Sequence, residues 1–102
     1  MLLINEQQYK DIVLKSNGVV MLDFFATWCA PCRALGQILE EVEDELKIPL
    51  YKMDVDQCVD VPRDYGVMSI PTVCIFKDGQ LLEKFIGYRD KNGVKEILKK
   101  YL

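Results

Sequence analysis

The chain has 102 residues, of which half are hydrophobic and 28% are charged, and its formal net charge is −3. This length and composition predict a single soluble globular domain over residues 1–102 and exclude an intrinsically disordered chain. The basic residues are spread along the chain and no apolar run is long enough to cross a membrane, so we expect neither nucleic acid nor membrane as a partner.

The first predicted elements are a short strand at residues 2–4 and a helix that begins at Asn5. Asn5 is followed three residues later by Gln8, which is a capping-box pattern, and Asn17-Gly18 provides the end of the helix. Residues 19–25 are almost continuously apolar, as is typical of a strand that is covered on both faces of a sheet. The chain is therefore expected to begin with a strand, a helix and a second strand.

A second helix is expected to begin near Pro31, because apolar residues then repeat at helical spacing. These residues are Leu35, Ile38, Leu39, Val42 and Leu46. The later elements are expected at residues 50–55 (strand), 59–65 (short helix or turn), 72–76 (strand), 81–86 (strand) and from Asp90 onward (helix). Asp78-Gly79, between the last two strands, is a strong hairpin signal.

Strands and helices alternate along most of this order. Such alternation predicts parallel strands joined by crossover helices, and the final hairpin adds an antiparallel edge. The expected fold class is therefore α/β, with three layers: a central mixed sheet and helices on both of its faces.

The start of the chain shows no targeting segment, because the apolar residues Met1 to Ile4 are followed at once by Asn5 and Glu6. We therefore expect a cytoplasmic protein, in the compartment that keeps thiols reduced. An export signal removed ahead of this sequence stays open as an alternative.

Four cysteines and no histidine limit the chemistry that is available. The absence of histidine removes the commonest general base and most zinc sites, and Cys58 and Cys74 stand alone, so neither a metal nor another cofactor is expected. Cys74 lies in an apolar run and is expected to be buried and inert. Cys58 opens a polar segment, where it is either a bystander or an exposed thiol that regulates the protein or forms dimers. A monomer is expected.

The segment Cys29-Ala30-Pro31-Cys32 lies between a buried strand and an amphipathic helix, and this context is typical of a redox dithiol. Residues three apart on a helix face the same side, with Cβ atoms about 5–6 Å apart. A disulfide needs Cβ atoms about 3.5–4.5 Å apart, so a small adjustment closes the bond. The pair is therefore expected to form and break a disulfide without unfolding the chain, although a structural pair stays open as an alternative.

The position of each cysteine predicts its role. Cys29 falls at the helix start, where free backbone N–H groups and the helix dipole favour a thiolate. Cys32 lies one turn further into the helix and is expected to be more buried. We therefore expect Cys29 to attack a client disulfide and Cys32 to resolve the mixed disulfide.

The sequence Trp28-Cys29-Ala30-Pro31-Cys32-Arg33 resembles the Trp-Cys-Gly-Pro-Cys-Lys motif of the thioredoxin family. The resemblance covers nearly the whole chain in the family's order. It includes Asp23 as the buried aspartate on the strand before the motif, Ile70-Pro71-Thr72 as the cis-proline loop, Phe76 to Gly79 as the hairpin, Gly87 as the glycine after the last strand and Lys52 to Asp56 as the strand that follows. Ala30 and Arg33 depart from the usual Gly and Lys, and Gln37 replaces a helix-kinking proline, so we expect a straighter second helix.

The resemblance implies a thioredoxin fold and a protein-disulfide reductase that is recharged by thioredoxin reductase and acts on disulfide-containing client proteins. It implies that Asp23 takes the proton from Cys32 and that Lys52 supports Asp23. It also implies a client-binding surface made of Trp28, Ala30, Pro31, Ile70, Pro71 and Gly87. Alternatives stay open: Asp23 reaches solvent or pairs with Lys52, and Pro71 is an ordinary proline at the start of a strand.

Three other functions remain. An oxidase or isomerase of the same fold typically resembles Cys-x-His-Cys, and Ala30-Pro31 lacks that histidine, which favours reduction. A glutaredoxin-like role fits Trp28 and Ala30 poorly. A binding subunit would use the surface of the fold and not its dithiol.

Val67 and Met68, ahead of the proline loop, are candidates for an apolar docking surface.

Overall fold

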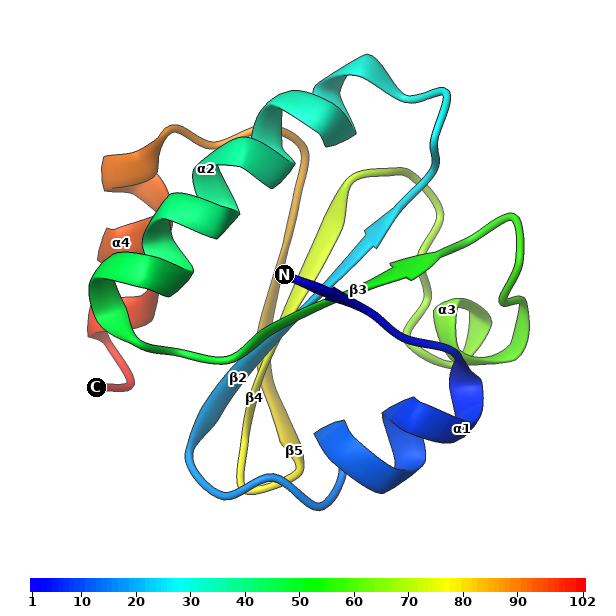
Figure 1. Cartoon of the computed structure of the whole chain (residues 1–102), viewed down its shortest axis with the longest axis horizontal. Coiled ribbons are helices and arrows are strands. Elements are labelled where there is room, and N and C mark those ends of the chain that lie inside the picture. The colour runs from blue at the N-terminus through cyan, green and yellow to red at the C-terminus, as the bar shows by residue number, and fades with distance from the viewer.

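The computed structural model describes residues 1–102 and contains a five-stranded sheet with helices on both faces (Figure 1). The elements are β1 (Leu2–Leu3), α1 (Glu6–Gln8), the π-helix η1 (Tyr9–Val13), β2 (Val19–Phe25), α2 (Ala30–Leu46), β3 (Leu50–Asp54), α3 (Asp60–Asp64), β4 (Thr72–Lys77), β5 (Gln80–Ile86) and α4 (Lys91–Lys99). This arrangement confirms the predicted α/β fold class with three layers.

The sheet has the strand order β1-β3-β2-β4-β5. Strands β1, β3 and β2 are parallel to one another, whereas β4 runs antiparallel to both β2 and β5. As a result β4 begins beside the point where β2 ends, with Thr72 opposite Phe24. The loops that follow β2 and β3 and the loop that precedes β4 therefore all lie at the same edge of the sheet, at the C-terminal end of β2.

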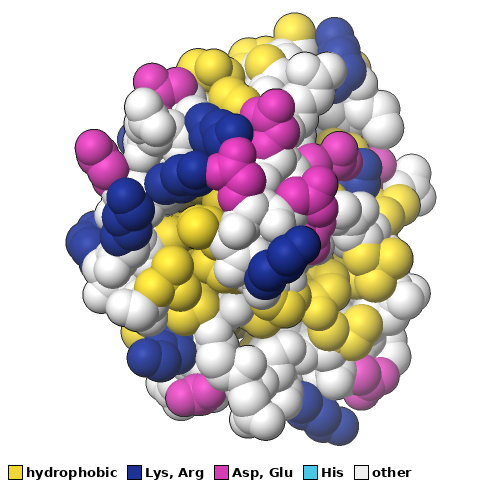
Figure 2. Space-filling model, turned by 60° about the vertical axis from the view of Figure 1, so that its left-hand side comes forward, with side chains coloured by type: hydrophobic (Ala, Val, Ile, Leu, Met, Phe, Trp, Pro, Cys, Tyr) yellow, Lys and Arg dark blue, Asp and Glu magenta, His cyan; other side chains and the backbone are white.

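Two separate apolar clusters fill the space above and below the sheet. Helices α2 and α4 pack on one face, with Leu35, Leu39, Val94 and Leu98 fully buried there. On the other face, η1 and α3 pack over a cluster that is rich in aromatic residues. On the face turned forward in Figure 2, basic and acidic side chains are interspersed, so neither sign of charge forms a continuous patch.

The first helix begins as predicted and ends earlier. The Asn5 side chain accepts a hydrogen bond from the Gln8 N–H (2.8 Å), and the Gln8 side chain accepts one from the Asn5 N–H (2.9 Å), which completes the capping box. The predicted end at residues 17–18 is wrong, because the helix continues only as η1 to Val13. The Ser16 hydroxyl and N–H both bond carbonyls of the last turn and close the helix there.

Helix α2 runs through Gln37 without a break, as the lack of a proline predicted. Its buried residues Cys32, Leu35, Leu39 and Val42 form one stripe, whereas Ile38 and Leu46 are only partly buried. The helix ends at Lys47, which adopts a left-handed conformation (φ 56°). One continuous helix therefore connects the Cys29–Cys32 segment to the core between the sheet and α4.

The hairpin between β4 and β5 turns at Asp78 and Gly79, which both have positive φ angles (52° and 79°). This is the geometry of the two-residue turn that the sequence predicted. Gly79 also lies against the chain that follows η1, since a Cβ atom at this position would be 2.4 Å from the Leu14 carbonyl oxygen.

Gly79→Ala is expected to lower the free energy of unfolding by about 1–3 kcal/mol more than Gly18→Ala, as measured by urea denaturation. Gly18 is a matched control because it has the same φ angle (79°), but a Cβ atom there would meet nothing within 4 Å. Equal losses for the two variants would contradict the close approach of Gly79 to Leu14.

Candidate functional site

The Cys29–Cys32 pair lies at the N-terminus of α2, where the sequence predicted it. Cys29 is the N-cap residue, with extended backbone angles (φ −90°, ψ 108°), and its Sγ accepts a hydrogen bond from the Cys32 N–H (3.3 Å). The two residues form a disulfide, and their Cα atoms are 5.2 Å apart. Cys32 is the more buried, with 3% exposure against 6% for Cys29. A sulfur atom thus occupies the position where helices usually carry an oxygen cap.

The loop that carries the pair is fixed by hydrogen bonds on both sides. The Cys29 N–H donates to the Ala26 carbonyl (3.2 Å), and the Arg33 guanidinium donates to the Thr27 carbonyl (3.0 Å). The Trp28 ring is 68% exposed, and its Nε1–H donates to the Asp56 carboxylate (2.9 Å) after β3. Ala30 and Pro31 are exposed on the first turn of α2. The disulfide is therefore surrounded by an ordered, exposed surface.

Asp23 is buried in the middle of the sheet, with 1% exposure, so the alternative in which it reaches solvent is wrong. Its neighbours across the sheet are Lys52 on β3 and Val73 on β4. No protein group bonds its Oδ1 atom. Burial raises the pKa of Asp23 from 3.8 to about 7, and the positive charge of Lys52 opposes this shift only in part. The Lys52 ammonium instead lies over the Phe25 ring, 5.2 Å from its centroid.

Asp23 and Cys32 line the same cavity, between α2 and the sheet, with a volume of about 390 Å³. Lys52 and Gln37 are also in its lining. A carboxyl group and the more buried cysteine thus line one cavity.

The predicted proline loop lies on the other side of the disulfide. The Ile70–Pro71 peptide bond is cis, and Ile70 packs against the cluster formed by Ala26, Cys29 and Cys32. The Gly87 N–H donates to the Pro71 carbonyl (2.8 Å), which joins the residue after β5 to this loop. Ile70, Pro71 and Gly87 are thus brought together beside the dithiol.

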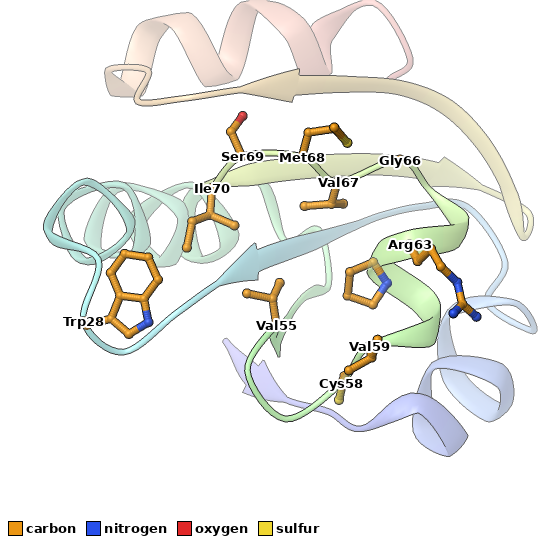
Figure 3. A pocket seen from close by; sticks show the side chains of 11 residues that line it. Trp28, Val55, Cys58, Val59, Arg63, Gly66, Val67, Met68, Ser69 and Ile70 are labelled. Atoms are coloured by element: carbon orange, nitrogen blue, oxygen red, sulfur yellow. The ribbon is translucent and has the colours of Figure 1, made fainter.

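A groove of about 410 Å³ extends from Trp28 and Ile70 toward α3 (Figure 3). Its lining is mainly apolar and includes Val67 and Met68, whose side chain is 93% exposed. The sequence did not indicate that Val55, Val59, Pro62 and Arg63 are also part of this lining. No local pattern could have done so, because these residues belong to other segments and meet the loop only in the folded chain.

The remaining cysteines are both buried and free. Cys74 is fully buried, which confirms the predicted burial, and this burial raises the pKa of its thiol to about 12. The suggestion that Cys58 is exposed is wrong: it packs in the aromatic-rich cluster on the η1 and α3 face of the sheet, and burial also raises the pKa of its thiol. No group of three or more side chains of ligand type is placed to hold a metal ion. None of the helices is long and apolar enough to span a membrane.

Comparisons with known proteins agree with this geometry. The family model described as Thioredoxin matches residues 1–100. A thioredoxin from Listeria monocytogenes is 47% identical over 89 residues, which are 85% of this chain and 86% of that protein. A thioredoxin from Bacillus subtilis is 42% identical over the same shares of both chains. Among solved structures, a mutant thioredoxin from Halobacterium salinarum superposes with a TM-score of 0.91 and 33% identity, covering 98% of this chain and 88% of that one.

Burial of Asp23 has a consequence for stability. Between pH 3.8 and about 7 the folded protein keeps the Asp23 proton that the unfolded chain has lost, so stability from this group falls as the pH rises through that window. Asp23→Asn cannot ionise. Its free energy of unfolding, relative to that of the wild type, is therefore expected to rise by roughly 4 kcal/mol between pH 4 and pH 8. Urea denaturation at both pH values measures the difference, and Asp44→Asn, at an exposed position on α2, controls for the lost charge. A constant difference between Asp23→Asn and wild type would contradict the raised pKa.

Proposed function

The chain belongs to the thioredoxin family, and we propose that it reduces disulfides in client proteins with Cys29 as the attacking thiol and Cys32 as the resolving thiol. Membership in the family and the disulfide between these two cysteines make it a thiol-disulfide oxidoreductase. The observation that carries the division of roles is the position of Cys29 as the N-cap of α2, with its sulfur accepting a backbone hydrogen bond.

The first step is attack by the Cys29 thiolate on one sulfur of the client disulfide. A Cys29–client bond forms, the client S–S bond breaks, and the second client sulfur leaves as a thiolate. The N-terminus of α2 favours the thiolate of Cys29 through its free N–H groups and its dipole. This electrostatic help gives only a modest rate advantage, because a more stable thiolate is also a weaker nucleophile.

The second step is attack by Cys32 on the Cys29 sulfur. The Cys29–Cys32 disulfide forms, the bond to the client breaks, and the client leaves with two electrons from the dithiol. The Cα atoms of the pair are 5.2 Å apart, so the attack is intramolecular, and effective molarities for such reactions reach about 10⁵ M or more. This proximity is the larger part of the rate advantage that we assign to the pair.

Cys32 must lose a proton before it attacks, and we assign that proton to Asp23. The chain has no histidine, and Asp23 shares a cavity with Cys32. A pKa of about 7 suits a base that works near neutral pH. Asp23 then returns the proton to solvent. Lys52, across the sheet, favours the ionised carboxylate and so supports this role.

The client is proposed to bind as an extended segment along the proline loop. Pro71 has no N–H, so backbone groups around Ile70 are available to a client strand beside Cys29. The surface formed by Trp28, Ala30, Pro31, Ile70, Pro71 and Gly87 supports this docking, and the apolar groove beside Trp28 extends it.

The electron donor, the redox group, the oligomeric state and the compartment are proposed by analogy with the family. We infer that a thioredoxin reductase recharges the dithiol, that the dithiol is the only redox group required, and that the protein works as a monomer in the cytoplasm. The fully covered position of Cys74 and the burial of Cys58 support a role for Cys29 and Cys32 alone in exchange. Neither of the two free thiols offers an exposed sulfur for dimer formation.

Serine substitutions test the two roles. Cys29→Ser is expected to abolish the reduction of insulin disulfides, because the attacking thiol is gone. Cys32→Ser is expected to attack still and to accumulate as a mixed disulfide, which non-reducing electrophoresis and mass spectrometry detect. Cys74→Ser is the control and is expected to turn over normally. Trapping by Cys29→Ser, or normal turnover by Cys32→Ser, would reverse or refute the assignment.

A further inference from the structure

One wall of the proposed client groove is the loop of residues 66–70. The loop begins at Gly66, which has a positive φ angle (65°), and ends at Ile70 beside the dithiol (Figure 3). Within it the Met68 side chain is almost fully exposed. The far end of the loop is held at Ile70, and its near end follows Tyr65, the C-cap residue of α3.

Tyr65 is held from three directions. Its hydroxyl shares a hydrogen bond with the hydroxyl of Tyr9. Its carbonyl accepts a hydrogen bond from the Lys84 ammonium on β5 (2.9 Å). Its ring packs edge-on against Phe76, with centroids 5.5 Å apart and an interplanar angle of 87°, and against Tyr9, with values of 6.0 Å and 76°.

Tyr9 is a firm support for this contact. It begins η1 directly after the capping box of α1, and its N–H donates to the Asn5 carbonyl (2.9 Å). Its ring is buried in the aromatic cluster beneath the sheet, where it also packs edge-on against Phe76. The hydroxyl bond thus connects a fixed point in the N-terminal helix to the start of the client loop, 56 residues later.

The two hydroxyls are not needed to fill space, because phenylalanine has the same ring. The hydroxyl pair is partly buried, and a hydroxyl withdrawn from water costs free energy unless it is paired, so the two groups favour a single relative position of the helices that carry them. The benefit of such a pair is geometric: it fixes the end of α3 relative to η1, and with it the first residue of the loop.

We propose that the Tyr9–Tyr65 hydroxyl pair is a positioning element for client recognition, which holds residues 66–70 in the arrangement that an extended client segment binds. The inference rests on the proposed client groove. Neither tyrosine contacts the client, and neither takes part in the thiol chemistry. Loss of the bond is therefore expected to weaken client binding and to leave the reactivity of the dithiol unchanged.

Single-turnover reduction of insulin by the pre-reduced protein tests the proposal. Tyr9→Phe is expected to raise the half-saturating insulin concentration by about fivefold, the size expected for one ordinary hydrogen bond, with the same limiting rate. Its rate with dithiobis(2-nitrobenzoate), a small disulfide that needs no groove, is expected to stay at the wild-type value. Tyr101→Phe is the matched control, because it also removes a tyrosine hydroxyl bond, to Glu83 (2.5 Å), at the C-terminal end of the chain. It is expected to change neither reaction.

A second pair of variants identifies the bond itself. Tyr65→Phe and the double variant Tyr9→Phe/Tyr65→Phe are expected to match Tyr9→Phe, because one bond is lost in every case. Hydrogen exchange provides an independent readout: the Val67 N–H, which donates to the Pro62 carbonyl (2.9 Å), is expected to exchange faster in Tyr9→Phe than in Tyr101→Phe. Additive effects of the two single variants on insulin binding would overturn the proposal.

Met68→Asp separates this proposal from the groove on which it rests. If Met68→Asp raises the half-saturating insulin concentration while Tyr9→Phe does not, the groove stands and the tyrosine pair has no role in recognition. If Met68→Asp has no effect, the groove is not the client site and both proposals are wrong. An equal loss of rate in Tyr9→Phe toward insulin and the small disulfide would also overturn the proposal, since the dithiol itself would then be disturbed.

Discussion

The junction between β2 and α2 determines the placement of every group that we assign to the reaction. A strand buried on both faces ends at the top of the sheet and passes through a short loop into the longest helix of the molecule. The helix N-terminus must therefore stand over the end of the sheet, where the Cys32 N–H donates to the Cys29 sulfur. The antiparallel direction of β4 brings the Ile70–Pro71 peptide to the same place, and the parallel direction of β3 brings Asp56 beneath Trp28.

The same junction explains why the carboxyl of Asp23 is buried. Asp23 lies on β2 between two neighbouring strands and shares a cavity with Cys32, and its buried Oδ1 finds no protein partner. Charge at this position is unfavourable, so the ionised form lowers the stability of the fold. A residue that lowers stability at neutral pH and shares a cavity with the buried cysteine fits the general trade between stability and function at active sites.

Much of the architecture was predictable because it depends on local patterns. The capping box at Asn5, the apolar run of β2 and the Asp78-Gly79 turn each act over a few residues, and each lies where it was predicted. The position of the cysteine pair at a helix start follows from the same kind of pattern. The early end of the first helix was missed because a π-helix has no distinct sequence signal and is stabilised by its packing against the sheet.

Features that depend on distant segments were not predictable in this way. The polar residues after Cys58 suggested exposure, but the thiol packs in the apolar cluster on the η1 and α3 face of the sheet. The wall of the apolar groove beside Trp28 combines the segments after β3, on α3 and before β4, and the bond between Tyr9 and Tyr65 joins residues that no local pattern relates. Each of these needs the tertiary packing on the η1 and α3 face of the sheet.

The role of Asp23 is tested most directly by the rate at which a mixed disulfide on Cys29 is resolved. Stopped-flow measurements from pH 6 to pH 9 compare wild type with Asp23→Asn, which keeps the shape of the side chain and removes the base. Slower resolution in the variant, by about tenfold or more, together with loss of the wild-type inflection near pH 7, would support proton transfer from Cys32 to Asp23. Equal rates across the whole range would contradict it and leave Asp23 with a structural role only.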